Sequence, residues 1–234
     1  MVNLVKFIAS SGISSRRQAE KFIRDGRVSV NGSTELNPAR RIVADDRVML
    51  DDAIVVPETG YRYILLHKPR GYVCSSADRH ADKLALDLLK QIPQRLVSAG
   101  RLDKDSEGAI IFSNDGAFIN RLTHPRYGIL KTYQVSTDSP LAPADLFLMH
   151  SGIMDDGELL KVQSAREIGR QCYEVILNEG KKREIRRLTA ACGATTIRLK
   201  RVKIGDIALG TLPPGKFRDL SEHEVALLTG EKEA

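Results

Sequence analysis

The chain has 234 residues, of which 42% are hydrophobic and 28% are charged, and its net charge is +6. This composition is typical of a globular protein and excludes disordered and collagen-like chains. The three cysteines, Cys74, Cys172 and Cys192, are far apart and odd in number, which argues against a disulfide framework or a zinc ribbon. We find neither a signal peptide nor an apolar run of about 18 residues, so we expect a cytoplasmic protein without a membrane segment.

Residues 1–58 are expected to form a small separate domain with two short helices and a small sheet. An apolar stripe at residues 4–8 predicts the first helix, which Gly12 would end. Ser15 and Gln18 have the spacing of a capping box at the start of the second helix. The predicted strands of this domain are 27–30 and 47–50, the first leading into an Asn-Gly turn.

Residues 59–234 interleave strand-like and helix-like segments without a regular βαβ rhythm. This predicts an α+β domain with a mixed, mainly antiparallel sheet flanked by helices. The predicted strands are 63–66, 109–112, 132–137 and 172–177. The predicted helices are 85–91, 117–123, 142–151 and 182–191.

The positive charge is concentrated near the C-terminal end of the chain. Residues 181–203 contain nine basic residues and one acidic residue, Glu184. Concentrated positive charge of this kind is typical of a nucleic-acid-binding surface. A solvated helix face would give the same pattern and remains an alternative at this point.

The segment 100–116 places several acidic residues directly before an apolar strand, and three interpretations compete. A calcium loop would need a bidentate carboxylate at its twelfth position, where this chain has Asn114. A solvated acidic turn is the second interpretation. The third is a catalytic carboxylate, Asp103, kept ionised by a nearby guanidinium such as that of Arg101. Spacing alone does not choose between the last two.

Four segments together resemble the pseudouridine synthases of the RsuA branch. Gly100-Arg101-Leu102-Asp103, followed by Ser106 and Gly108, resembles the signature of that family. The segments 65–75 (LLHKPRGYVCS), 124–135 (HPRYGILKTYQV) and 178–188 (NEGKKREIRRL) match the same branch in order. Residues 11–32 resemble the small S4-like RNA-binding domain that these enzymes carry. The family often has Thr at the position of Ser106 and Leu at that of Ala109.

The resemblance implies an enzyme that isomerises uridine to pseudouridine without a metal or an organic cofactor. It implies that Asp103 is the catalytic group, that Tyr133 packs against the target base, and that Arg186 pairs with Asp103. These three residues are therefore expected to meet, although they lie far apart in the sequence.

The expected partner is ribosomal RNA or a ribosome-assembly intermediate, bound by a monomeric enzyme, with the large-subunit RNA favoured. The basic residues expected to contact RNA are Arg16, Arg17, Lys21, Arg24, Arg27, Lys68, Arg101, Lys182, Arg183, Arg187 and Lys200. The alternative hypothesis is a non-catalytic RNA-binding or ribosome-assembly factor on the same fold. A protein sharing only the N-terminal domain would leave the four segments of residues 59–234 unexplained.

Overall fold

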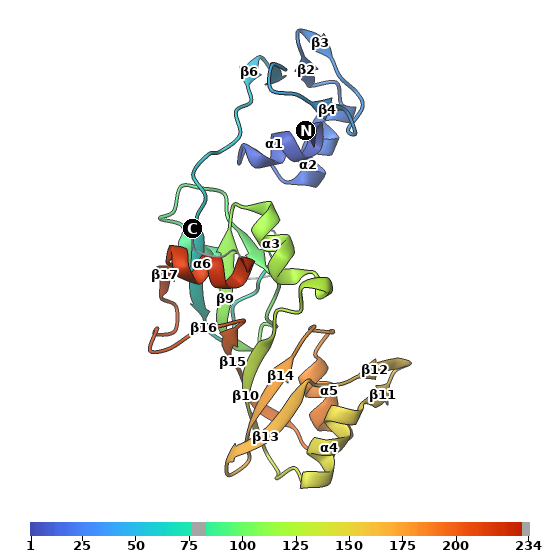
Figure 1. The fold of residues 1–234 in the computed structure, drawn as a ribbon, viewed down its shortest axis with the longest axis vertical. Helices are drawn as coiled ribbons and strands as arrows, with labels where there is room; N and C mark the ends of the chain where they lie inside the picture. The colour runs from blue at the N-terminus through green and yellow to red at the C-terminus, as the bar shows by residue number, and fades with distance from the viewer. Residues whose placement is uncertain (76–82, 231–234) are drawn as a thin grey trace. The chain divides into compact units, whose positions relative to one another are not determined.

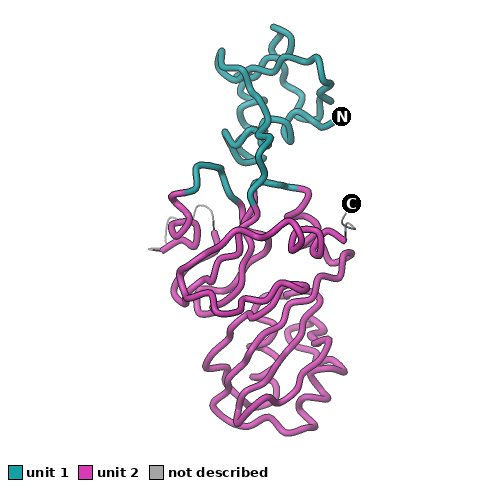
Figure 2. Tube along the Cα trace, turned by 60° about the vertical axis from the view of Figure 1, so that its left-hand side comes forward, with its two compact units in different colours: residues 1–62, 92–96, 114–116 teal, residues 63–91, 97–113, 117–234 magenta. Residues whose placement is uncertain are grey.

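The computed structural model describes residues 1–75 and 83–230, which divide into two compact units (Figure 2). Unit 1 comprises Met1–Arg62 with Ile92–Leu96 and Asn114–Gly116, and the remainder of the chain forms unit 2. The domain boundary at residue 58 stays a prediction. Within the described ranges, none of the helices combines the length and the apolar character that crossing a bilayer requires.

Unit 1 contains the two predicted helices, α1 (Leu4–Ser10) and α2 (Arg16–Arg24). The Ser15 hydroxyl accepts a hydrogen bond from the backbone N–H of Gln18 at 3.2 Å, which confirms the predicted N-cap. The strands are β1 (Val2–Asn3) with β4 (Arg41–Ile42), and a four-stranded sheet in the order β3 (Ser33–Thr34), β2 (Val28–Val30), β5 (Val48–Leu50) and β6 (Ala53–Ile54).

The helices of unit 1 pack on this sheet through a small apolar core. Leu4, Ile8, Ala19 and Ile23 are fully buried. Burying each large aliphatic side chain contributes about 1.5–3 kcal/mol before the entropy of ordering is subtracted. The opposite face of α2 is polar and basic, as the amphipathic pattern of the sequence predicts.

Unit 2 is built on one large sheet, whose main path runs β13-β14-β10-β15-β9-β7-β17. These strands are β13 (Ser164–Gly169), β14 (Cys172–Leu177), β10 (Lys131–Thr137), β15 (Thr196–Ile204), β9 (Glu107–Ser113), β7 (Tyr63–Lys68) and β17 (Phe217–Asp219). Along this path β15 and β9 pair in parallel, and the other pairs are antiparallel. The expected mixed, mainly antiparallel sheet of an α+β domain is confirmed.

Helices cover the two halves of this sheet separately (Figure 1). In one half, α4 (Pro143–Ser151) and α5 (Glu184–Ala191) lie beside β13 and β14. In the other half, α3 (Gly116–Thr123) and α6 (Glu222–Thr229) bury apolar side chains against the strands that include β7 and β9. The predicted helix at 85–91 is instead a short 3-10 helix, Ala85–Leu89, and a second one spans Pro125–Tyr127.

Several elements are absent from the sequence prediction, and the most important of these is β15. It is the nine-residue strand that joins the two halves of the sheet. The short strands β8 (Val97–Ala99), β11 (Ile153–Asp155), β12 (Glu158–Leu160) and β16 (Ile207–Ala208) and the helix α6 are also unpredicted. In β15 the polar and apolar residues do not alternate cleanly, so the period-2 signal of a strand is weak.

The two halves of the sheet meet at β9 and β15, where Gly108 of β9 is paired with Arg201 of β15. Gly108 has a positive φ of 111°, which disfavours any residue with a side chain. A Cβ atom on Gly108 would lie 2.2 Å from the Arg201 carbonyl oxygen and 2.7 Å from the Arg201 amide nitrogen. The parallel pairing of β9 and β15 therefore requires glycine at this position.

We predict that Gly108→Ala lowers the free energy of unfolding by roughly 2–5 kcal/mol, because it adds backbone strain to a clash with main-chain atoms. Gly193→Ala is the matched control, since Gly193 also has a positive φ of 78° but nothing lies within 4 Å of its Cβ position. The control should lose only about 1 kcal/mol. Urea unfolding of both variants measures the difference, and equal losses would contradict the role of close approach.

Candidate active site

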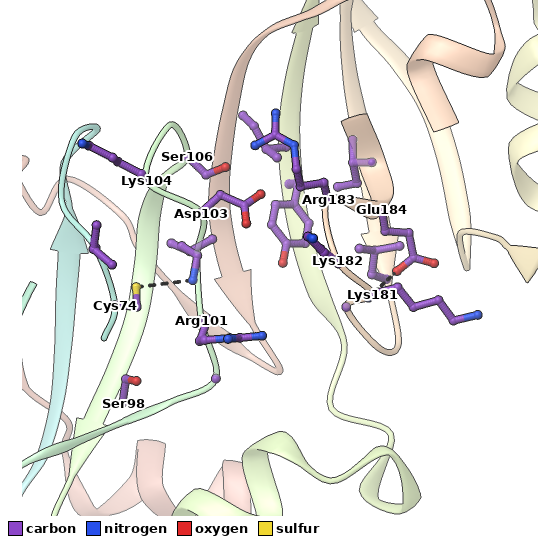
Figure 3. Close-up of a pocket in the computed structure, with 18 of the residues that line it drawn as sticks. Cys74, Ser98, Arg101, Asp103, Lys104, Ser106, Lys181, Lys182, Arg183 and Glu184 are labelled. Atoms are coloured by element: carbon purple, nitrogen blue, oxygen red, sulfur yellow. Dashed lines mark hydrogen bonds between the residues drawn. The ribbon is translucent and has the colours of Figure 1, made fainter. Parts of the chain in front are cut away.

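A cavity of about 990 Å³ opens where the two halves of the unit 2 sheet meet (Figure 3). Residues of the segments 73–75, 98–106 and 180–185 line it, together with Tyr133, Leu177 and Leu199. The charged lining residues are five basic and two acidic: Arg101, Lys104, Lys181, Lys182, Arg183, Asp103 and Glu184. This cavity suits a ligand that is polar and carries negative charge.

Hydrogen bonds join two of the motif segments at one wall of the cavity. The backbone N–H of Gly71 donates to the Lys104 carbonyl at 2.6 Å. The backbone N–H of Leu102 lies 3.4 Å from the Cys74 sulfur, the contact drawn in Figure 3. The motif at 65–75 thus supports the loop of the motif at 100–108, which carries Asp103.

Asp103 lies at the centre of this loop and lines the cavity, half-buried. Its carbonyl accepts a hydrogen bond from the Ser106 N–H at 3.1 Å, which fixes the loop as a turn. Figure 3 shows the carboxylate directed toward the side of the cavity that carries Lys182 and Arg183. Within residues 1–75 and 83–230, this carboxylate has no ion-pair partner at 4.0 Å or less, so it is available to a ligand.

Tyr133 enters the cavity from β10, although its side chain is largely buried, with 7% of the residue exposed. Its hydroxyl oxygen lies 3.4 Å from Nη1 of Arg201. The structure therefore brings Asp103 and Tyr133 to one cavity, as the resemblance implies for the family. Arg201 is the residue of this region that the sequence analysis missed.

Arg186 does not pair with Asp103, and the expected pair is corrected by the structure. Its Nη2 atom lies 3.2 Å from the Asp105 carboxylate, and it also donates to the Asp105 carbonyl at 3.2 Å. Burial lowers the pKa of Arg186, while the negative charges of Asp105 and, more weakly, Asp103 oppose that shift. Arg186 therefore holds the loop that carries Asp103 by binding Asp105, which lies two residues after Asp103.

The expected contact of Lys68 with RNA is also corrected, because Lys68 is fully buried and cannot reach RNA phosphate in this structure. Its ammonium donates to the carbonyls of Pro69 at 3.0 Å and Tyr72 at 2.8 Å. Desolvation lowers the pKa of Lys68, which is the expected effect of burying an ammonium. Lys68 therefore stabilises the turn at 68–72, and its ammonium is not exposed to a ligand.

Arg187 is held within the fold by two carboxylates, contrary to its expected contact with RNA. It donates to Asp155 at 2.5 Å and to Glu158 at 2.6 Å, and also to the Asp155 carbonyl. These pairs raise the pKa of Arg187, with Glu158 as the larger cause. Its guanidinium ties α5 to the β11–β12 hairpin, so the arrangement does not favour a phosphate contact.

The other predicted RNA-binding residues are more accessible. Arg101, Lys182 and Arg183 are exposed and line the cavity, and Lys200 is half-buried on β15. Those of unit 1 are exposed along or just after α2, where Arg24 pairs with Glu20 and Arg27 pairs with Asp51. The remaining basic residues of that surface are Arg16, Arg17 and Lys21. Their contact with RNA stays a prediction.

Among residues 1–75 and 83–230, no group of three or more His, Cys, Asp or Glu side chains is placed to hold a metal ion. His80 lies outside the described residues.

Comparison with known families identifies both parts of the chain. Residues 62–191 match the RNA pseudouridylate synthase family, and residues 2–48 match the S4 domain. The chain belongs to the RNA pseudouridine synthase family and carries an S4 domain at its N-terminal end. The enzymes of this family are isomerases, and the family recognised from the four motifs is confirmed.

Individual relatives cover nearly the whole chain. An RNA pseudouridine synthase of Aquifex aeolicus is 38% identical over 97% of this chain and 93% of its own length. Ribosomal large subunit pseudouridine synthase B of Bacillus subtilis is 35% identical, covering 97% and 96%. Ribosomal small subunit pseudouridine synthase A of Escherichia coli is 34% identical, covering 96% and 99%. A crystal structure of a pseudouridylate synthase superposes with a TM-score of 0.70 at 29% identity, covering 97% of this chain and all of that one.

One further titratable group lies close to the site residues in the sheet. Lys131 is two residues before Tyr133 on β10, and its ammonium lies 3.3 Å from the Asn178 carbonyl. Burial, with a smaller effect of the nearby positive charge of Arg201, lowers the pKa of Lys131 to about 8. The folded protein therefore releases the Lys131 proton at a lower pH than the unfolded chain does.

This shift predicts a pH-dependent stability that Lys131→Met removes. Between the folded pKa of about 8 and the unfolded value near 10.4, the unfolded chain holds one more proton at this site. The free energy of unfolding of the wild type should therefore rise with pH relative to the variant, by about 1–2 kcal/mol, because solvent screens part of the effect. Lys131→Arg, which stays charged, is the control and should show no such rise. Parallel profiles from pH 7 to 10 for all three proteins would contradict the shift.

Proposed function

We propose that this protein converts a uridine of ribosomal RNA to pseudouridine, with Asp103 as the catalytic group. The observation that carries the proposal is the Asp103 carboxylate, which lines the cavity without an ion-pair partner in the described part of the chain. Tyr133 lines the same cavity, and the basic residues Arg101, Lys182 and Arg183 surround it. A reactive carboxylate beside an aromatic ring and a basic rim suits a nucleotide.

The chemistry is an isomerisation that needs no net oxidation or hydrolysis. The bond between the sugar and N1 of uracil breaks, the base turns, and a new bond forms between the sugar and C5. The proton on C5 leaves, and N1 gains a proton, so the formula is unchanged. Asp103 has three possible first steps: attack on the uracil ring, attack on the sugar carbon, or removal of a sugar proton. Each of them requires an ionised carboxylate next to the extruded nucleotide.

The enzyme must also take the uridine out of its stack, which costs a few kcal/mol. Contacts with the flanking phosphates can offset this cost. Lys182 and Arg183 stand at the rim of the cavity, where the backbone beside an extruded nucleotide would pass. The S4 domain adds a second basic surface on α2. Both features support an enzyme that binds structured RNA broadly and acts on one base.

Two relatives point to ribosomal RNA as the substrate, one named for the large subunit and one for the small subunit. Their identities to this chain, 35% and 34%, do not discriminate between the subunits. We propose the large-subunit RNA, which the resemblance of the sequence segments 124–133 and 181–188 favours. A non-catalytic RNA-binding factor is the alternative, and the presence of Asp103 in an open cavity argues against it.

The central prediction is that Asp103→Asn abolishes turnover and leaves RNA binding intact, because the amide cannot act as a nucleophile or base. Release of tritium from RNA labelled at C5 of uracil measures turnover, and a filter-binding assay measures affinity. Asp206→Asn is the control, since Asp206 is an exposed acid that pairs with Lys203 on the surface. We expect release from large-subunit RNA by the wild type and the control. Absence of release from either ribosomal RNA by the wild type would favour the non-catalytic alternative.

A second prediction separates the basic residues that face RNA from those used by the fold. Arg183→Met should reduce the slope of log affinity against log salt by about 0.7–0.9, the effect of one lost phosphate contact. Arg187→Met should leave this slope unchanged and lower the thermal stability, because Arg187 binds Asp155 and Glu158. The reverse result, a changed slope for Arg187 alone, would assign the phosphate contact to Arg187.

A further inference from the structure

The guanidinium of Arg201 lies beside the Tyr133 ring, 5.9 Å from its centroid, and Arg201 is almost inaccessible, with 4% of the residue exposed. Its Nε atom donates to the Ala109 carbonyl of β9 at 2.6 Å. Its Nη1 atom lies 3.4 Å from the Tyr133 hydroxyl and 3.5 Å from the Arg101 carbonyl. A single side chain thus contacts β9, β10 and the loop that carries Asp103.

This burial is costly for the free energy of folding. No carboxylate forms an ion pair with Arg201 within residues 1–75 and 83–230, and its Nη2 atom has no hydrogen-bond partner there. The positive charge of Arg201 also contributes to lowering the pKa of both Lys68 and Lys131. A buried cation that repels its neighbours and leaves a donor unsatisfied calls for a reason beyond stability.

The sheet register explains why Arg201 occupies this position. On one side of β15, Arg201 is paired with Tyr133, and on the other side it is paired with Gly108. In the described part of the chain, Arg201 is not among the residues that line the cavity, so it does not offer its charge to a ligand directly. Whatever effect it has on a bound nucleotide must pass through Tyr133 or through the loop.

We propose that Arg201 is a positioning residue that orients the Tyr133 hydroxyl and the Asp103 loop toward each other for turnover. This inference rests on the proposed function. The Tyr133 oxygen accepts from the guanidinium, so the hydroxyl keeps its own proton as a donor that can be directed into the cavity. The bond from Arg201 to the Arg101 carbonyl holds the start of the catalytic loop at the same time.

A double-mutant cycle with Tyr133→Phe and Arg201→Lys tests this role. Lysine keeps the charge but cannot span the three acceptors, so we expect the rate at saturating RNA to fall by about tenfold or more. The Kd for RNA should stay within about twofold of the wild type, since Arg201 is buried. In the Tyr133→Phe background the same substitution should cost less than about threefold, because the hydroxyl that it orients is already gone.

Arg218→Lys is the matched control, because Arg218 pairs with the carboxylate of Glu224 and, in the described part of the chain, is not among the residues that line the cavity. This substitution should leave the rate unchanged. Equal effects of Arg201→Lys in both backgrounds, or full activity of Tyr133→Phe, would overturn the proposal. A weakened Kd with an unchanged rate would instead make Arg201 an RNA contact.

Separate measurements distinguish a failure to fold, a failure of the proposed function and a failure of the role proposed for Arg201. Arg201→Gln is made in parallel, and each variant is checked by thermal unfolding. If neither variant folds, Arg201 is a structural residue and the proposal is wrong. If the wild type releases no tritium from ribosomal RNA, the proposed function fails. If the wild type turns over and the cycle is additive, only the role of Arg201 fails.

Discussion

The contact between β9 and β15 at Gly108 and Arg201 is the constraint on which the site depends. Tyr133 lies on β10, the neighbour of β15 in the sheet, and the loop before β9 carries Asp103. Only a residue without a side chain permits the two backbones to approach as they do. The separation of the aromatic ring and the carboxylate is therefore set by a backbone contact rather than by either side chain.

In the described part of the chain, the ion pairs of the loop that carries Asp103 leave the Asp103 carboxylate without a partner. Asp105 takes the ion pairs, with Arg183 at 3.3 Å and Arg186 at 3.2 Å. Those pairs anchor the loop to α5 and keep positive charge close to Asp103. A direct pair between Asp103 and Arg186 would also place positive charge beside the loop, but it would occupy the carboxylate that the proposed reaction needs. Asp105 thus anchors the loop through its ion pairs, and Asp103 supplies the carboxylate for the proposed reaction.

The elements whose signal is local were predictable from the sequence. The Ser15 cap needs only the hydroxyl and a nearby backbone N–H, and the apolar run at 109–112 is buried whatever strand lies beside it. The strand β15 gives only a weak signal because its polar and apolar residues do not alternate cleanly. In the structure Ile197 is exposed and Arg201 is buried, the reverse of what their polarity predicts. The partner of Arg186 and the burial of Lys68 depend on contacts between distant segments, which no local pattern encodes.

The same limit applies to the basic segment 181–203, where counting charges overstates the surface available to RNA. Arg186, Arg187 and Arg201 are committed to contacts within the fold. Lys181, Arg198 and Lys203 form ion pairs with nearby acids. Among residues 1–75 and 83–230, Lys182 and Lys200 form no ion pair, and Lys182 lines the cavity. Arg183 pairs with Asp105 at 3.3 Å, but it is exposed and lines the cavity as well. Part of the charge of this segment is therefore accessible at the cavity, where the proposed function would use it to contact the backbone beside the extruded nucleotide. The other basic residues make contacts within the fold.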